Sequence, residues 1–248
     1  MKIQVSVPLK DQGETLFAGH VGAALAIGRI ERRVNVGLFV TAALLLDFVL
    51  WLFILFGWES VNITEDFSTT HQPHFVFPSS HGLLAAGGWS AAAGVLTLLL
   101  SPYLKEARRR AAALVAGAVF SHWLLDVLVH RSELPLTGNT SVTVGLALWN
   151  DMPAALAIEA AIVALGLCLF LPKSGLARGK SIALGILILI VLMSTIIGMT
   201  IAPPPSSAAA MAGSSLVALV AVCGLIAWLG RVSREERFST SLSEDRHD

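Results

Sequence analysis

Residues 120–131 read Phe120-Ser-His-Trp-Leu-Leu-Asp-Val-Leu-Val-His-Arg131, an apolar segment that carries three evenly spaced polar residues. His122, Asp126 and His130 are four residues apart, and side chains at that spacing lie on the same face of an α-helix. An ionisable group at membrane depth is costly and is rarely kept without a function. The segment therefore predicts a membrane helix with one functional polar face.

The composition of the whole chain also indicates a membrane protein. Hydrophobic residues make up 55% of its 248 positions, charged residues make up 14%, and the mean hydropathy is +0.73. Soluble domains are usually about 45–50% apolar and about 25% charged. We therefore expect membrane lipids as partners, and the formal net charge of +0 gives no reason to expect a nucleic acid.

A transmembrane helix needs about 20 mainly apolar residues. Six segments of the chain meet this requirement, namely residues 34–57, 82–101, 111–130, 152–171, 181–202 and 211–230. A seventh segment, residues 15–30, is shorter and rich in alanine and glycine, yet it is apolar apart from His20 until Arg29. Together these segments predict an all-α, polytopic transmembrane helical bundle of about seven spans.

The connections between the spans indicate the topology, because cytoplasmic loops are enriched in Lys and Arg. These residues gather in every second connection: Arg29, Arg32 and Arg33; Lys105 and Arg108–Arg110; Lys173, Arg178 and Lys180; and Arg231, Arg234 and Arg237. The alternate connections are poor in them, and residues 58–80 contain three acids and no Lys or Arg. We therefore expect the N-terminus outside and the C-terminus inside.

Two polar tails flank the predicted bundle. Residues 15–230 are expected to form a single transmembrane domain with an outer loop at 58–80, preceded by a polar N-terminal tail at residues 1–14. Residues 231–248 are polar and rich in serine and charges. That composition predicts a disordered cytoplasmic tail.

The topology converts positions in the sequence into depths in the bilayer, since a helix rises about 1.5 Å per residue. Asp126 then lies roughly 6 Å and His122 roughly 12 Å below the outer end of their helix. Asp47 lies about 15 Å and His20 about 8 Å from the outer ends of theirs, and His81 opens a helix at the outer edge. These five potential ligands are therefore expected in the outer half of the bilayer.

Imidazole nitrogens and carboxylate oxygens are common ligands of zinc and related divalent ions. A catalytic site also leaves a position for a water whose pKa the metal lowers. His122 and Asp126 at i and i+4 can bind one ion, although such a pair can equally be a hydrogen-bonded couple that joins two helices. The shared depth of His20, Asp47 and His81 favours a divalent metal site, and zinc is the expected ion. All five residues are ligands, or four are ligands and the fifth acts as a base.

Five further residues can assist such a site. His71 and His74 in the outer loop either fold over the site or stay solvated. His130 and Arg131 either bind an anionic headgroup or substrate phosphate, or anchor their helix at the interface. Glu159, about two turns into its helix, pairs with a site histidine, carries a proton, or packs as a neutral hydrogen-bonded carboxyl.

Several motifs resemble a known family. They are Gly19-His-Val-Gly22, the helical Asp47, Pro78-Ser-Ser-His-Gly-Leu-Leu84, Ser121-His-Trp-Leu-Leu-Asp-Val-Leu-Val-His-Arg-Ser-Glu-Leu-Pro-Leu136 and Gly145-Leu-Ala-Leu-Trp-Asn150. Over about residues 15–165 the chain resembles the YdjM-like metal-dependent hydrolases, which are integral membrane proteins of bacteria. The resemblance implies the bacterial cytoplasmic membrane as the location. It also implies a metal held by ordered His and Asp residues, here His20, Asp47, His81, His122 and Asp126.

Three functions fit these residues. The resemblance implies hydrolysis of a lipid-linked or otherwise amphiphilic ester or phosphoester from the outer face. A permease or ion-coupled transporter can use the same groups to relay protons or to bind a moving cation. A structural membrane protein can use them to join its helices. The sequence leaves the oligomeric state open.

Overall fold

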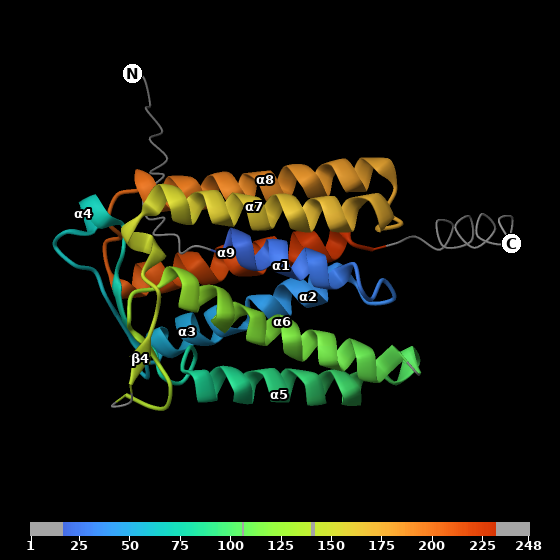
Figure 1. Cartoon of the computed structure of the whole chain (residues 1–248), viewed down its shortest axis with the longest axis horizontal. Helices are drawn as coiled ribbons and strands as arrows, with labels where there is room; N and C mark the ends of the chain where they lie inside the picture. The colour runs from blue at the N-terminus through green and yellow to red at the C-terminus, as the bar shows by residue number, and fades with distance from the viewer. Residues whose placement is uncertain (1–16, 106, 140–141, 232–248) are drawn as a thin grey trace, which may run out of the picture.

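The structure is a computed structural model that describes residues 17–105, 107–139 and 142–231. Its elements are α1 (Ala18–Gly28), α2 (Val36–Ala43), α3 (Leu45–Leu55), β1 (Ser60–Asn62), α4 (Phe67–Thr70), β2 (His74–Val76), α5 (Leu83–Leu100), α6 (Ala107–Val129), β3 (Leu134–Pro135), β4 (Thr143–Val144), α7 (Met152–Phe170), α8 (Arg178–Thr200) and α9 (Ala208–Leu229), with 3-10 turns at Pro102–Leu104, Leu148–Asn150 and Leu171–Lys173. The long helices run along one axis, and the loops that carry α4 and β4 lie at one end (Figure 1). The predicted tails 1–14 and 231–248 lie outside the described residues, apart from Arg231.

Five helices, α5 to α9, are long and apolar enough to cross a membrane. The helices α2 and α3 pass the same test together, and they fit one broken span with a bend of 48° at Leu44. These elements match the six full-length segments expected from the sequence, so the prediction of an all-α transmembrane bundle is confirmed. The chain is a multi-pass membrane protein.

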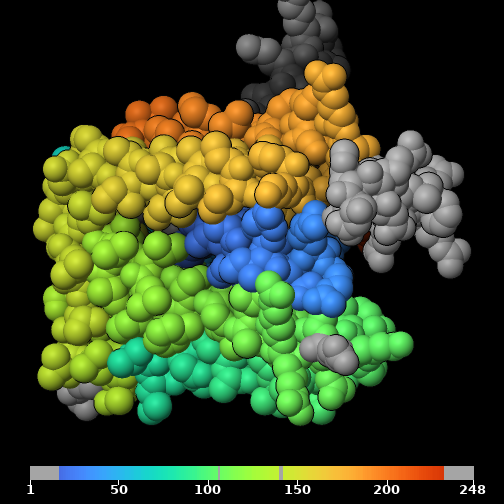
Figure 2. Space-filling model, turned by 45° about the vertical axis from the view of Figure 1, so that its right-hand side comes forward, coloured from blue at the N-terminus to red at the C-terminus, as the bar shows by residue number. Residues whose placement is uncertain are grey.

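The seventh predicted segment forms a shorter helix, α1, which covers residues 18–28 of the expected 15–30. Its 11 residues rise about 16 Å, roughly half of a hydrocarbon core that is about 30 Å thick. Most of α1 is buried between α7, α2 and α6, and Figure 2 shows it lying between α7 and α6. Therefore α1 is an internal helix that carries His20 into the middle of the bundle.

The contact between α1 and α7 depends on two glycines. A Cβ atom added at Gly22 would lie 2.7 Å from the carbonyl oxygen of Ile162, and one added at Gly166 would collide with the carbonyl of Gly22. Small residues at such positions allow the backbones of two membrane helices to approach closely. Because His20 is two residues before Gly22, this crossing also sets the position of its imidazole.

The basic connections lie together at one end of the bundle. Three side-chain hydrogen bonds join them: Arg32 donates to the carbonyl of Lys173 (3.0 Å), Arg110 to that of Ile30 (2.8 Å), and Lys180 to that of Arg231 (2.6 Å). Glu31 is buried at this end and accepts two hydrogen bonds from the Arg33 guanidinium, which hold the pKa of that carboxyl below its ordinary value. These contacts tie the ends of α1, α6, α7, α8 and α9 together.

The opposite end of the bundle is covered by folded segments. Within residues 58–80, β1 pairs antiparallel with β2, and α4 lies between them in the chain. Likewise β3 pairs antiparallel with β4 after α6. Phe75 and Phe77 are buried and belong to the core of the bundle, whereas Val76 between them is exposed. The outer loop therefore covers this end of the bundle with aromatic side chains.

The variant Gly166→Ala is expected to destabilise the protein by about 1–3 kcal/mol, because the new methyl group has to displace the backbone of α1. Thermal unfolding in detergent measures this as a lower melting temperature. The matched control is Gly87→Ala, since a Cβ atom at Gly87 meets no atom within 4 Å. Equal melting temperatures for the two variants would contradict the close crossing of α1 and α7.

The basic end is expected to face the cytoplasm, because Lys and Arg are enriched in cytoplasmic loops. Exposed positions at the two ends allow a direct test with Ser68→Cys in α4 and Gly179→Cys in α8, in a background where Cys168 and Cys223 are alanine. In intact cells a membrane-impermeant maleimide is expected to label the first cysteine. It should reach the second only after permeabilisation, and the reverse pattern would mean the opposite orientation.

Candidate metal centre

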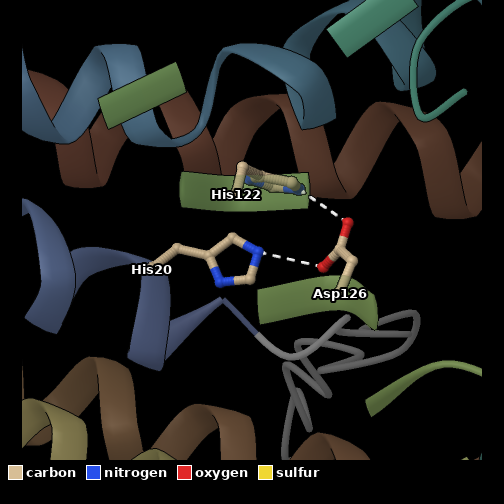
Figure 3. A group of neighbouring side chains, drawn as sticks. All are labelled: His20, His122 and Asp126. Atoms are coloured by element: carbon tan, nitrogen blue, oxygen red, sulfur yellow. Dashed lines mark hydrogen bonds and ion pairs between the residues drawn. The ribbon is translucent and has the colours of Figure 1, made fainter. Parts of the chain in front are cut away.

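The five side chains expected to bind a metal meet in the interior of the bundle. His122 and Asp126 lie on one face of α6, His20 comes from α1, Asp47 from α3, and His81 from the turn before α5. All five are buried. Figure 3 shows His20 and His122 both directed toward the Asp126 carboxylate, with one polar contact to each of its oxygens.

The distances between the polar atoms fit a metal site. Nε2 of His81 and Nε2 of His122 are 3.1 Å apart. Oδ2 of Asp126 lies 3.5 Å from the His81 nitrogen and 3.2 Å from the His122 nitrogen, and Oδ1 of Asp47 lies 3.6 and 3.7 Å from the same two nitrogens. Nε2 of His20 lies 3.1 Å from Oδ1 of Asp126. Ligand atoms bound about 2.0–2.1 Å from a tetrahedral zinc lie about 3.3 Å apart. The side chains form two groups that could hold a metal ion: His20, His122 and Asp126, and Asp47, His81 and His122.

The backbone fixes which nitrogen of His122 carries the hydrogen. Nδ1 of His122 lies 2.6 Å from the carbonyl oxygen of Ala43, at the break between α2 and α3. A carbonyl oxygen can only accept, so Nδ1 must carry the hydrogen. In the neutral ring, Nε2 then presents a lone pair toward Asp47, His81 and Asp126.

A side-chain relay fixes His81 in the same way. The Ser80 hydroxyl lies 2.6 Å from Oε2 of Glu59 and 2.8 Å from Nδ1 of His81. The single hydroxyl hydrogen goes to the ionised carboxylate, so the hydroxyl oxygen must accept from Nδ1–H of His81. Glu59 is itself held by the backbone N–H groups of Ser79 and Ser80 (2.7 and 2.9 Å). In the neutral ring, Nε2 of His81 therefore also presents a lone pair.

The two lone pairs face each other in a buried site that also holds two carboxylates. Neutral His81 and His122 cannot form a hydrogen bond between their Nε2 atoms, because neither atom carries a hydrogen. Oδ2 of Asp126 is buried beside them and accepts no hydrogen bond among the described residues. Buried acceptors and negative charges without partners are costly. The arrangement thus requires a cation, which is either an added proton or a metal ion.

A small cavity adjoins the cluster. It has a volume of about 20 Å³, and Asp47, His81 and Asp126 line it together with Phe77 and Trp149. A cavity needs only about 10–15 Å³ to hold one water molecule, provided that polar partners are present. The centre therefore has room for one water beside its carboxylates.

Glu159 belongs to neither metal-binding group, and it contacts the backbone next to His20. Its Oε2 accepts a hydrogen bond from the N–H of Gly19 at 2.5 Å. A Cβ atom at Gly19 would lie 2.6 Å from the other carboxyl oxygen, so glycine is required for this approach. Nδ1 of His20 is buried and has no hydrogen-bond partner among the described residues. Glu159 thus positions the segment that carries His20.

The histidines of the outer loop do not reach the cluster. His71 lines a separate, larger cavity, and His74 is exposed, with Nε2 at 3.2 Å from a guanidinium nitrogen of Arg131. Neither loop histidine belongs to the two groups that could hold a metal ion. Phe75 and Phe77 from the same loop line the small cavity instead.

His130 lies inside the protein, not at its surface. Its ring is buried, Nδ1 lies 2.7 Å from a carboxyl oxygen of Glu133, and the ring centre is 4.1 Å from that of Trp149. It lines the small cavity with Asp47 and Asp126. The structure thus separates His130 from Arg131, which faces the larger cavity.

Sequence reasoning did not find Glu59, Ser80 or the carbonyl of Ala43. Ser80 is adjacent to His81 and follows Glu59 by 21 residues, a separation that carries no periodic signal. Ala43 offers only its backbone, and its part depends on a helix break inside a continuous apolar run. These three groups nevertheless determine which nitrogen of each neutral imidazole carries the hydrogen.

No known protein family, curated protein or solved structure matches this chain. Function has to be argued from the site in such a case, because a fold alone supports many activities. The fold establishes a multi-pass membrane protein, and its buried His and Asp groups could hold a metal ion.

The variant Ser80→Ala is expected to lower the affinity for a divalent ion by about 10–100-fold, because it removes the acceptor that orients His81. Competition with a chelator, followed by metal analysis of the protein, measures this affinity. Ser90→Ala is the matched control, since Ser90 is also buried but its hydroxyl donates to the Ala86 carbonyl in α5. An unchanged affinity in Ser80→Ala would mean that the relay from Glu59 does not orient a ligand.

Proposed function

We propose that this chain is a metal-dependent hydrolase of the bacterial cytoplasmic membrane. It binds one divalent ion, zinc, and cleaves an ester or phosphoester of a lipid-linked or otherwise amphiphilic substrate that enters from the outer face. The location and the reaction class follow from the resemblance to the YdjM-like hydrolases. The metal follows from the geometry of the centre.

One observation carries the proposal of a metal. Nε2 of His81 and Nε2 of His122 are 3.1 Å apart, and both rings donate from Nδ1 to other groups, so that two lone pairs converge. The carboxylates of Asp47 and Asp126 add two negative charges within 3.7 Å of these nitrogens. A divalent cation neutralises that charge and accepts both lone pairs, whereas one added proton does so only in part.

The residues then have separate roles. His122 belongs to both groups that could hold the ion, with Asp47 and His81 in one and with His20 and Asp126 in the other; Oδ2 of Asp126 also lies 3.5 Å from Nε2 of His81. His20 contacts the other oxygen of Asp126 and holds the orientation of that carboxylate. A bound metal lowers the pKa of its water and makes it a nucleophile near neutral pH.

The surroundings of the water also suit hydrolysis. The small cavity has room for one water beside Asp47, and a carboxylate oxygen left free by the ion can accept its proton. Phe77 and Trp149 exclude bulk solvent from the same cavity. Exclusion of water strengthens the electrostatic interactions within a site and prevents side reactions.

A second candidate function is ion-coupled transport, and the break between α2 and α3 favours it. Transporters place ion sites where a broken membrane helix exposes backbone carbonyls. Here the Ala43 carbonyl at such a break contacts His122. The same cluster can then bind a moving cation instead of a resident one.

Metal analysis of the purified protein tests the centre. Wild type is expected to retain about one tightly bound divalent ion per chain, and His122→Ala and the isosteric Asp47→Asn are expected to lose it, because each removes a ligand. His74→Ala is the matched control, since His74 is exposed and lies outside the cluster. Metal-free wild type, or full metal content in all three variants, would mean that the cation at the centre is a proton. Either result would remove the basis for the hydrolase.

Assays of activity separate the two candidate functions. Hydrolysis of amphiphilic esters or phosphoesters in detergent, without any ion gradient, supports the enzyme, and it should disappear in Asp47→Asn together with the metal. Cation uptake into vesicles that needs a gradient, without hydrolysis, supports the transporter.

A further inference from the structure

A second, larger cavity lies at the outer end of the bundle. Its volume is about 650 Å³, and α4, Arg131, the start of α7 and the end of α8 form its walls. Cavities of roughly 300–1,000 Å³ are typical of sites for small molecules. The cavity is therefore large enough for a ligand that the 20 Å³ chamber at the metal centre cannot hold.

The polar wall of this cavity carries an available positive charge. Arg131 is half-buried, and its guanidinium contacts the neutral acceptor Nε2 of His74 at 3.2 Å. Among the described residues, no ion pair joins that guanidinium to a carboxylate, although its charge also acts on Asp66. Asp151 on the same wall caps α7 through the N–H of Ala154. Arginine binds carboxylate and phosphate oxygens with two parallel hydrogen bonds, so Arg131 suits an anionic ligand.

Two other polar atoms in the wall have no partner. Gln72 donates to the carbonyl of Trp149 (2.8 Å), but its own carbonyl oxygen accepts no hydrogen bond among the described residues. Nε1 of Trp149 is also buried without an acceptor. Both side chains are only 4% exposed. These two atoms are closed off from solvent, so the polar side of the cavity consists of Arg131 and the threonines of α4.

Part of the lining of this cavity is apolar. Met152, Pro153 and Met199 line the cavity there. Ile201, two residues after Met199, is 73% exposed on the same helix end. A ligand can therefore place a polar head against Arg131 while its apolar part remains along the ends of α7 and α8. This combination of walls matches an amphiphile rather than a free ion.

Trp149 connects this cavity with the metal centre. Trp149 lines both the large cavity and the small one, and its ring centre lies 4.1 Å from that of His130. A ligand in the large cavity thus lies beside a residue that also borders the metal centre.

We propose that the large cavity is the entry site for the substrate, and that it binds an amphiphile with an anionic headgroup through Arg131. The assignment rests on the proposed function for the reaction that follows, but binding itself needs only the cavity. Thr69 and Thr70 lie beside the head, Met152 and Met199 contact the apolar part, and Trp149 borders both this cavity and the small one at the metal centre.

Binding of short-chain lipids to the full chain in a neutral detergent tests the proposal, with isothermal titration calorimetry as the measurement. The probes are dihexanoyl phosphatidate, the zwitterionic dihexanoyl phosphatidylcholine and inorganic phosphate. Phosphatidate is expected to bind more tightly than the other two. Arg131→Gln should weaken its binding by about tenfold or more, because a charge-assisted hydrogen bond is lost.

Two further variants control this experiment. Thr69→Trp fills the cavity from an exposed position without a change of charge, and it should weaken binding as well. Arg109→Gln removes an exposed arginine at the basic end and should bind like wild type. Equal affinities in Arg131→Gln, Thr69→Trp and wild type would overturn the proposal, and phosphate bound as tightly as phosphatidate would overturn the assignment to an amphiphile.

Metal content measured in the same samples distinguishes the two proposals. If wild type binds its metal but Arg131→Gln binds phosphatidate as tightly as wild type, only the proposal of the entry site is overturned. Wild type that lacks metal, with an affinity that depends on Arg131, overturns the hydrolase and leaves the binding site.

Discussion

The centre of this protein depends on a constraint on two imidazole rings. The Ala43 carbonyl holds the hydrogen on Nδ1 of His122, and the relay from Glu59 through Ser80 holds it on Nδ1 of His81. Their Nε2 atoms therefore meet as two acceptors 3.1 Å apart, among carboxylates and away from water. Such a site is stable only with a cation between them, since buried charges and acceptors need partners.

The irregular parts of the fold serve this constraint. The break between α2 and α3 places the Ala43 carbonyl beside the imidazole of His122. The short helix α1 lies inside the bundle because Gly22 lets its backbone touch that of α7, and this brings His20 to Asp126. Non-helical backbone within a membrane protein is tolerated where it is buried in protein, and functional sites are where local rules are most often broken.

Much of the centre could be predicted from local patterns, and the rest could not. The i, i+4 spacing of His122 and Asp126 and the common depth of the other three residues indicated that the five side chains lie at one level of the bundle, because helical rise relates sequence position to depth. The contact of Glu159 with Gly19 joins residues 140 positions apart, and that of His122 with Ala43 joins residues 79 apart. No periodicity relates such pairs, since helix packing alone decides which faces meet.

The sequence by itself determined the membrane class, the six long apolar segments and the types of ligand at membrane depth. These properties follow from composition and from periods of a few residues, which each segment carries independently of its neighbours. Only the tertiary structure decided that α1 is internal, that aromatic rings rather than loop histidines line the centre, and that Trp149 borders two cavities. Those features depend on which surfaces pack together, and side-chain volume and backbone approach in three dimensions set that outcome.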